Sequence, residues 1–219
     1  YNDLIANQVI NLNINNMHNF ITFEGIEGSG KSTQVKMLND YFLKNNIDSI
    51  LTREPGGTAL AEKIRELLLS EEFGKICSKT EILLNYAARK DHVKKLIIPS
   101  LESGKKVISD RFFDSTFAYQ GFGRGANLDL IAKIHGQILK NFAPDITFLI
   151  DTDADKSMKR LESRNDINKF DKMGIEFHQR IREGFLHIAR NNPNRIKIID
   201  GNGSQDEVHQ EILNNITLY

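Results

Sequence analysis

The stretch Gly25-Ile26-Glu27-Gly28-Ser29-Gly30-Lys31-Ser32 decides the fold, because it matches the pattern G-x-x-x-x-G-K-[ST] without a gap. An apolar run, FITFE at residues 20–24, precedes it, and residues with helical spacing follow it from Thr33 to Asn45. A glycine-rich turn between a strand and a helix lets backbone N–H groups and the helix N-terminus converge on phosphate oxygens. The sequence therefore predicts a phosphate-binding loop.

Outside this loop, short apolar runs alternate with longer amphipathic segments. Five runs predict buried strands, at residues 20–24, 49–54, 105–110, 145–151 and 195–200. The segments between them carry apolar residues three and four positions apart, as at Ile64, Leu67 and Leu68, which is typical of helices. Strands that alternate with helices predict an α/β fold with a parallel sheet covered on both faces. Together with the phosphate loop, this pattern predicts a P-loop NTPase fold.

The organisation of the chain is expected to be a tail followed by one domain. Residues 1–19 contain scattered apolar residues among many asparagines and show no clear period, so we expect an N-terminal tail or extension. Met17 stands just before the first strand, so we expect the native start near it. Residues 20–219 are expected to form the domain, and the polar, charged stretch at about residues 157–175 is expected to be its mobile lid.

Composition excludes several classes of protein. The 219 residues contain 29 Lys plus Arg and 29 Asp plus Glu, a balance that gives no support for a nucleic-acid or membrane-surface partner. No apolar run approaches the roughly 20 residues that span a bilayer. The single cysteine, Cys77, excludes an internal disulfide and any multi-cysteine zinc site, and we expect it to be a small buried side chain. A cytoplasmic location is expected.

Three further segments predict a second ligand beside the phosphate loop. Asp110 ends a predicted strand and suits Mg²⁺, while Arg111 can bind phosphate oxygens with both arms of its guanidinium. Arg53 precedes a Pro-Gly-Gly turn at the same predicted sheet edge. Tyr86 and Arg89 lie one helical turn apart, where a ring can stack on a base and a guanidinium can bind its edge. Core packing and surface ion pairs remain the alternatives for these residues.

A GTPase is the alternative suggested by residues 168–171, which read N-K-x-D, the pattern that recognises guanine. A GTPase also needs a D-x-x-G sequence between that pattern and the phosphate loop. No Asp from residue 33 to residue 167 has Gly three positions later. We therefore interpret the N-K-x-D match as a coincidence.

Six segments in order resemble the thymidylate kinase family, of the bacterial type, over residues 20–218: EGIEGSGKST, TREPGGT, YAAR, SDRFFDST, AYQGFGRG and IIDGNGSQDEV. The resemblance implies a five-stranded parallel core, a mobile lid, a homodimer, and transfer of phosphate from ATP to dTMP with Mg²⁺. The product dTDP leads to dTTP for DNA replication. A kinase for another nucleotide such as dUMP, a deoxynucleoside kinase, an NTPase switch and a non-catalytic binding module remain alternatives.

The resemblance also implies roles for particular residues. ATP would be bound by the loop residues Gly25, Ile26, Glu27, Gly28, Ser29, Gly30, Lys31, Ser32 and Thr33. Mg²⁺ would be held by Ser32 and Asp110. The acceptor would be bound by Arg53, Tyr86, Arg89, Arg111, Thr116, Tyr119 and Gln120, with Tyr119 excluding a 2′-hydroxyl. The catalytic set would be Lys31, Arg111, Glu27, Arg160 and Arg164, the last two from the lid.

The chain departs from the family pattern at two places. The aromatic residue that stacks on the base usually lies four positions before the arginine, which is Asn85 here, whereas Tyr86 lies three positions before. We assign the stacking role to Tyr86. The lid sequence Asp-Arg-x-Glu of the family is replaced by residues 168–171, so Arg160 and Arg164 are the remaining candidates for a lid arginine.

Overall fold

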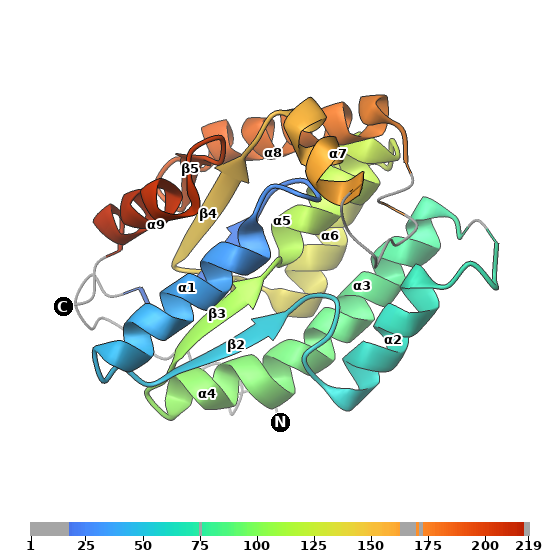
Figure 1. Cartoon of the computed structure of the whole chain (residues 1–219). Helices are drawn as coiled ribbons and strands as arrows, with labels where there is room; N and C mark the ends of the chain where they lie inside the picture. The colour runs from blue at the N-terminus through green and yellow to red at the C-terminus, as the bar shows by residue number, and fades with distance from the viewer. Residues whose placement is uncertain (1–17, 75, 163–169, 171–172, 217–219) are drawn as a thin grey trace, which may run out of the picture.

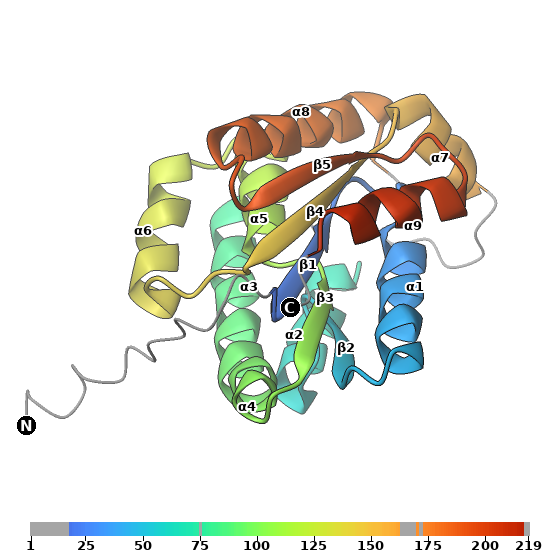
Figure 2. The ribbon, with the colours of Figure 1, turned by 90° about the vertical axis from the view of Figure 1, so that its left-hand side faces the viewer.

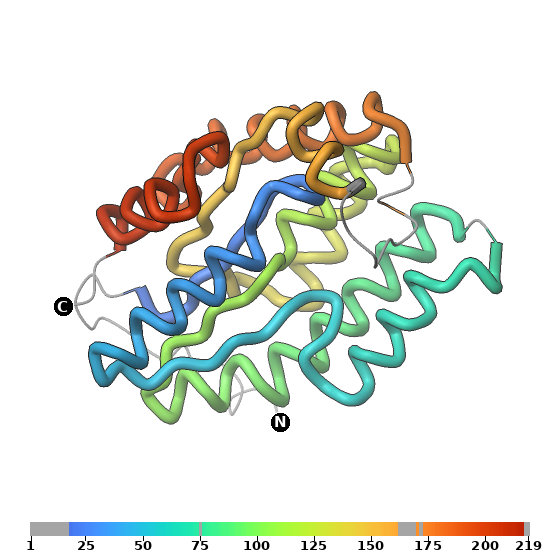
Figure 3. Tube along the Cα trace, viewed as in Figure 1, coloured from blue at the N-terminus to red at the C-terminus, as the bar shows by residue number. Residues whose placement is uncertain are grey.

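The computed structural model describes residues 18–74, 76–162, 170 and 173–216. Figure 1 shows the ribbon of the whole chain, and Figure 3 shows its Cα trace in the same view. Most of the expected N-terminal tail and part of the expected lid lie outside the described residues. Asn19, at the end of that tail, already joins the sheet: its carbonyl oxygen accepts from Val107 N and its backbone N–H donates to Asp145.

Five parallel strands form the sheet in the order β2-β3-β1-β4-β5. Their bounds are β1 Phe20–Glu24, β2 Ser49–Arg53, β3 Lys106–Asp110, β4 Ile146–Asp151 and β5 Ile196–Asp200. All five agree with the predicted strands to within one residue at each end. Because the strands are parallel, their carboxyl ends meet at one edge, where ligands of such sheets bind.

Helices connect the strands, and α9 follows the last strand. Their bounds are α1 Lys31–Lys44, α2 Ala59–Leu69, α3 Ser78–His92, η1 Val93–Ile97, α4 Ile98–Glu102, α5 Phe113–Thr116, η2 Phe117–Gly123, α6 Leu128–Leu139, α7 Ala154–Glu162, α8 Ile175–Asn191 and α9 Gln205–Asn214. The two η segments are π-helices. Side chains at the N-termini of α2, α6 and α9 accept backbone N–H groups, which explains why these helices begin at those positions.

Helices cover both faces of the sheet, as Figure 2 shows, with α1 and α9 on one side and α3, α5 and α6 on the other. A hydrophobic core lies between the sheet and each of these layers. Successive side chains of a strand point to opposite faces. In β1, Ile21 and Phe23 pack against the α1 and α9 side, whereas Phe20 packs against the opposite layer. The predicted three-layer α/β architecture is confirmed.

The expectation that all five strands are buried is wrong for the two outer ones. No residue of β2 is fully buried, and Leu51 is 41% exposed. Ile198 of β5 is exposed as well. Both strands lie at the edges of the sheet, where one side lacks a neighbouring strand. Apolar composition alone does not distinguish an edge strand from a central one.

Cys77 also differs from expectation, because it is exposed rather than buried. It precedes α3, and its Sγ lies 3.2 Å from Thr80 Oγ1. Within the described ranges, no helix combines the length and the apolar character needed to cross a membrane.

Candidate functional site

The phosphate loop runs from the end of β1 into α1 and wraps around the Lys31 side chain. Lys31 Nζ donates to the carbonyl oxygens of Gly25 (2.9 Å) and Ile26 (2.6 Å). The positive φ of Gly25, 143°, places its Cα so close to β4 that an added Cβ would lie 2.6 Å from the Ile150 carbonyl oxygen. A side chain at this position would therefore push the loop away from the sheet.

A hydroxyl and a carboxylate meet at the start of α1. Ser32 Oγ donates to Asp110 Oδ2 at 2.7 Å, although the two residues are 78 positions apart. The pairing follows from topology, because β3 lies next to β1 and Asp110 is its last residue. The two predicted magnesium ligands are thus adjacent.

Arg111, the next residue, is the centre of the cluster on the other side of the loop. Its backbone φ is 71°, a left-handed conformation that is costly for a residue with a side chain. Its guanidinium donates to Gly25 O (3.0 Å), Glu27 Oε1 (3.1 Å) and Tyr119 Oη (2.9 Å). Tyr119 in turn donates to Glu27 Oε2 at 2.5 Å. The Arg111 guanidinium, the Glu27 carboxylate and the Tyr119 phenol are therefore hydrogen-bonded to one another.

Burial and charge set the protonation of this cluster. Burial favours a higher pKa for Glu27, but the positive charges of Arg111 and Lys31 outweigh it, so the pKa lies below the usual value. Burial raises the pKa of Tyr119 well above its usual value, so its hydroxyl keeps its proton and donates. Burial, followed by the charge of Arg111, lowers the pKa of Lys31 to about 8.

Glu24, the last residue of β1, orders the segment after Arg111 and was not predicted as a site residue. Its carboxylate accepts from the backbone N–H of Phe112 (2.8 Å) and from the hydroxyl of Ser115 (2.6 Å). Burial, and then the charge of Asp114, raise the pKa of Glu24 to about 7. A carboxylate at the end of a strand directly before a phosphate loop was the available sign of this role.

Arg89 reaches the same region from α3 through a buried network. Its Nε donates to Glu54 Oε2 at 2.6 Å, and Nη1 donates to Thr116 Oγ1 at 3.1 Å. Glu54 also contacts His92 Nδ1 at 3.0 Å, and the other ring nitrogen of His92 lies 2.6 Å from Thr52 Oγ1. The two residues predicted to bind a base edge, Arg89 and Thr116, are thus hydrogen-bonded to each other.

The AYQGFGRG segment packs on a buried carboxylate of α3. Gln120 Nε2 donates to Glu81 Oε2 at 3.1 Å, and Arg124 forms an ion pair with the same carboxylate. Gln120 and Tyr119 both belong to the π-helix η2. The wider turn of a π-helix is often found at functional sites, and here it carries both side chains into one cavity.

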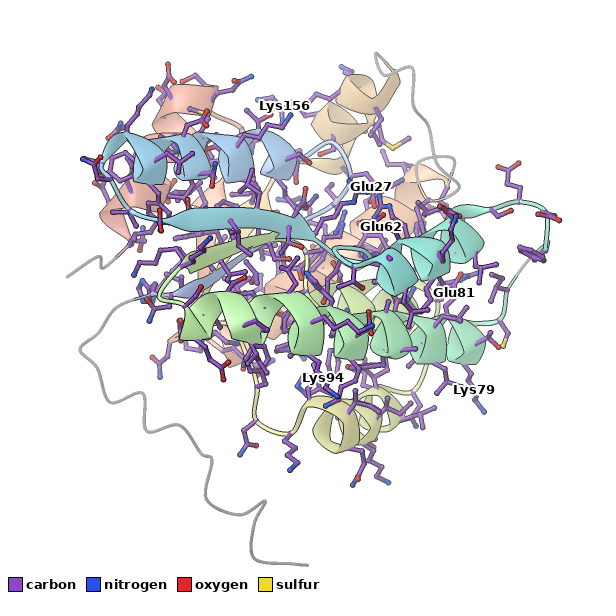
Figure 4. All side chains as sticks on the ribbon, turned by 90° about the horizontal axis from the view of Figure 1, so that it is seen from below. Glu27, Glu62, Lys79, Glu81, Lys94 and Lys156 are labelled. Atoms are coloured by element: carbon purple, nitrogen blue, oxygen red, sulfur yellow. The ribbon has the colours of Figure 1, made fainter. Side chains whose placement is uncertain are left out.

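One cavity of about 210 Å³ joins the predicted donor and acceptor residues. Twelve predicted residues line it: Glu27, Gly28, Gly30, Lys31, Ser32, Arg53, Arg89, Asp110, Arg111, Thr116, Tyr119 and Gln120. Figure 4 labels Glu27, Glu62 and Glu81, which come from the phosphate loop, α2 and α3 and lie toward the same end of the molecule. Arg53 enters at the rim, where it forms a 3.0 Å ion pair with Glu62.

Tyr86 lies outside this cavity, which corrects its assignment as a stacking residue. Its side chain is 1% exposed and belongs to the apolar core between α3, α6 and the sheet. Its ring faces His135 edge-on and carries the Arg89 guanidinium at 4.8 Å. The neighbouring Asn85 lines the cavity instead. On a helix, adjacent residues point about 100° apart, so only one of the two can face the site.

Arg160, on α7, reaches the phosphate loop from the opposite side. Its Nη1 donates to the carbonyl oxygens of Gly28 (3.2 Å) and Ser29 (3.4 Å). Arg164 and most of residues 163–172 lie outside the described residues. Phe170 is described and lines the cavity, with its ring edge-on to Tyr119 at 5.7 Å. The predicted lid segment therefore contributes two described side chains near the site.

Comparisons with known proteins agree on one family. The family model described as thymidylate kinase matches residues 23–212. A thymidylate kinase of Carboxydothermus hydrogenoformans is 47% identical over 193 residues, covering 88% of this chain and 94% of that protein. One from the Wolbachia of Brugia malayi is 45% identical over 202 residues, covering 90% and 95%. The crystal structure of thymidylate kinase from Ehrlichia chaffeensis has a TM-score of 0.71 and 41% identity, covering 89% of this chain and 96% of that one.

Proposed function

This chain belongs to the thymidylate kinase family, and from that premise we propose that it transfers the γ-phosphoryl group of ATP to dTMP. The bond between the γ-phosphorus and its bridging oxygen breaks, and a dTMP phosphate oxygen forms the new bond, giving ADP and dTDP. The observation that carries the proposal is the single cavity that joins Lys31 and the Ser32–Asp110 pair to the Arg111–Glu27–Tyr119 cluster. A step toward dTTP for DNA replication follows from this reaction.

On the donor side, the loop residues 25–33 would bind the phosphates of ATP. Backbone N–H groups at the start of α1 attract anions, and Lys31 would exchange its loop carbonyl partners for the β and γ phosphates. Phosphoryl transfer needs alignment and neutralisation of spread negative charge more than covalent help. No general base is assigned, because the phosphate of dTMP is already an anionic nucleophile near neutral pH.

The pKa of Lys31 gives a pH dependence for ATP binding. Phosphates favour the charged ammonium, whose pKa is about 8, so affinity should be constant below pH 8 and should fall above it. The Kd for ATP is expected to rise by up to about tenfold per pH unit above pH 8. Calorimetric titration between pH 7 and pH 9.5 measures this change, and a Kd that stays flat up to pH 9.5 would contradict it.

The residues fit a magnesium ion bound together with ATP. Mg²⁺ prefers oxygen ligands and keeps several waters, so one hydroxyl and one carboxylate suffice when phosphates supply the rest. Ser32 and Asp110 provide this pair, whereas no group of three or more His, Cys, Asp or Glu that would form a metal cage occurs among the residues described. When bound, Mg²⁺ would neutralise phosphate charge.

Asp110→Asn is expected to raise the Mg²⁺ concentration that gives half-maximal activity by about tenfold, since it removes one negative charge from the site. Asp40→Asn, an exposed change on α1, should leave the Mg²⁺ curve unchanged. The measurement is initial rate against free Mg²⁺ at fixed ATP. Identical curves for wild type and Asp110→Asn would rule out Asp110 as a metal residue.

On the acceptor side, Arg111 and Arg53 would hold the phosphate of dTMP, and Arg89 and Thr116 would bind the thymine edge. Their support is the shared cavity and the network that fixes Arg89 against Glu54. Gln120 would border the base from η2. Asn85, rather than Tyr86, is the residue of α3 placed to lie beside that base.

Tyr119 is proposed to exclude ribonucleotides, because it lines the cavity beside Glu27, where its ring would lie against the deoxyribose and leave no room for a 2′-hydroxyl. Tyr119→Ala should therefore raise kcat/KM for ribosylthymine monophosphate relative to dTMP by about tenfold or more, the usual scale for a steric filter. Tyr119→Phe keeps the ring and should keep the discrimination. An unchanged ratio in Tyr119→Ala would show that selection lies elsewhere.

The lid, residues 157–175, and its arginines are proposals of the same kind. An enclosed site keeps water from the γ-phosphate, and Arg160 and Arg164 are the candidates to neutralise charge on the transferring group.

We also propose a homodimer, supported by apolar side chains that stay exposed on α2 and α3, namely Leu60, Leu67 and Leu83. A cytoplasmic location is proposed, in keeping with a single cysteine.

The experiment that tests the proposed function is coupled ADP release with ATP and Mg²⁺ across a panel of acceptors. The panel contains dTMP, dUMP, dGMP, ribosylthymine monophosphate, thymidine and no acceptor. Strong turnover with dTMP alone is expected. Preference for dUMP or thymidine would establish one of the other kinase activities, and equal turnover without acceptor would establish an NTPase.

A further inference from the structure

His178, on α8, is a buried polar side chain without a hydrogen-bond partner. Its side chain is 1% exposed, and neither Nδ1 nor Nε2 has a partner. His92 is equally buried but uses both ring nitrogens, toward Glu54 and Thr52. A buried polar group without a partner is unfavourable, so its presence in a native fold points to a state in which it is used.

Helix α8 packs against Tyr119, which lines the acceptor side of the cavity. Phe177 and Phe185, on the same face of the helix, pack edge-on against the Tyr119 ring at 6.4 and 6.1 Å. Gly184 allows this approach, since a Cβ there would lie 2.7 Å from Phe122 of η2. His178 directly follows Phe177 on α8, so this packing holds it near the Glu27 partner of Tyr119.

The group nearest to His178 is the carboxylate of Glu27. Nδ1 lies 3.7 Å from Glu27 Oε2, which is too long for a hydrogen bond but within ion-pair distance. A water molecule that bridged Nδ1 and Oε2 by two hydrogen bonds would need a larger separation between these two atoms. A shift of less than about 1 Å brings the two atoms to hydrogen-bond distance.

Glu27 would need a second donor when an acceptor binds. Its Oε1 accepts from Arg111, and its Oε2 accepts from Tyr119. In the proposed reaction Arg111 turns to the acceptor phosphate, so Glu27 loses its charged partner at that moment. An ionised carboxylate has about four acceptor positions, so Oε2 can accept from Tyr119 and from a second donor together.

We propose that His178 is a positioning residue that donates from Nδ1 to Glu27 Oε2 in the acceptor-bound state and so holds Glu27 against the acceptor sugar. This inference rests on the proposed phosphorylation of dTMP. It assigns His178 to the acceptor side, because His178 faces the Glu27 carboxylate, whereas the ATP phosphates would contact the backbone N–H groups of the loop and the Lys31 ammonium.

Three substitutions test the proposal. In His178→Asn the amide nitrogen takes the place of Nδ1, in His178→Gln it takes the place of Nε2, and His178→Leu has no donor. The KM for dTMP is expected to rise about tenfold or more in His178→Leu and His178→Gln, the scale of losing a hydrogen bond to a charged group. It should stay within about threefold in His178→Asn, and the KM for ATP should not change in any variant.

The matched control is His187→Asn, an exposed histidine on the same helix. A dTMP KM in His178→Leu equal to wild type would overturn the proposal, and so would equal losses in His178→Asn and His178→Gln. A wild-type enzyme that ignores dTMP would instead refute the proposed function, so the two failures are distinguishable.

A measurement on the wild-type protein does not depend on how well the variants fold. With ¹⁵N-labelled histidine, addition of dTMP should move the Nδ1 proton of His178 downfield, as expected when a hydrogen bond to a carboxylate forms. A His178 signal unchanged at saturating dTMP would overturn the proposal.

Discussion

Lys31→Gln is expected to lower kcat for dTDP formation by about a thousandfold, the upper range for loss of one donor that stabilises transition-state charge. Lys31 is buried, and its ammonium is the cation enclosed by the loop carbonyls of Gly25 and Ile26. Glutamine keeps a hydrogen-bond donor but removes the charge. The measurement is steady-state kcat and KM with ATP, Mg²⁺ and dTMP.

Lys36→Gln is the matched control, because Lys36 lies on the same helix and is exposed. It should retain the wild-type kcat. Thermal unfolding of both variants separates loss of charge from loss of fold. If Lys31→Gln kept more than a tenth of the wild-type kcat, the assignment of Lys31 to the transferring phosphate would be wrong.

Arg160→Ala is expected to lower kcat by about a hundredfold to a thousandfold while changing the KM for dTMP by less than about threefold, as for an arginine that acts mainly in the transition state. The guanidinium of Arg160 already lies on the loop carbonyls of Gly28 and Ser29, within reach of a γ-phosphate bound there. Steady-state kinetics with each substrate varied in turn measure the separation of kcat from KM.

Lys159→Ala, one residue earlier on α7 and exposed, is the control and should leave kcat unchanged. Arg164→Ala completes the set, since Arg164 is the other candidate. Normal turnover in both Arg160→Ala and Arg164→Ala would exclude a lid arginine from this chemistry.

The strands and the phosphate loop were predictable because local pattern determines them. The G-x-x-x-x-G-K-S match fixes a strand, a turn and a helix together, and the other four apolar runs are each bounded by polar or turn residues. The exposure of β2 and β5 was not predictable, because an edge is a property of strand order and not of the strand itself. Strand order is set by contacts distant in sequence.

At the site, the spacing of residues along the sequence predicted most of the residues that line the cavity, but not how their side chains are oriented. Tyr86 and Asn85 are adjacent, and the choice of which one faces the cavity depends on how α3 packs against α6 and the sheet. In the family, the stacking residue lies four positions before the arginine, a position that Asn85 occupies in this chain. In the structure it is Asn85 that lines the cavity. Preferring the aromatic residue type over helical position produced the wrong assignment.

The sequence did not predict the carboxylates and the histidine that contact the site residues, for a different reason. Glu24, Glu54 and His178 act through other residues, and each contacts a partner at least 35 positions away in sequence. Only Glu24 has a local sign, its place at the end of a strand directly before the phosphate loop, whereas Glu54 and His178 have none. Their burial, which is visible only in the fold, is what distinguishes them from surface charges.

The most direct test of the central claim is to follow the γ-phosphate itself, with γ-labelled ATP, Mg²⁺ and dTMP at enzyme concentrations that allow a single turnover. Phosphoryl transfer predicts that the label appears in dTDP at the rate at which ADP forms, with little inorganic phosphate. Label released as inorganic phosphate, at a rate that does not depend on dTMP, would contradict the assignment of this chain as a dTMP kinase.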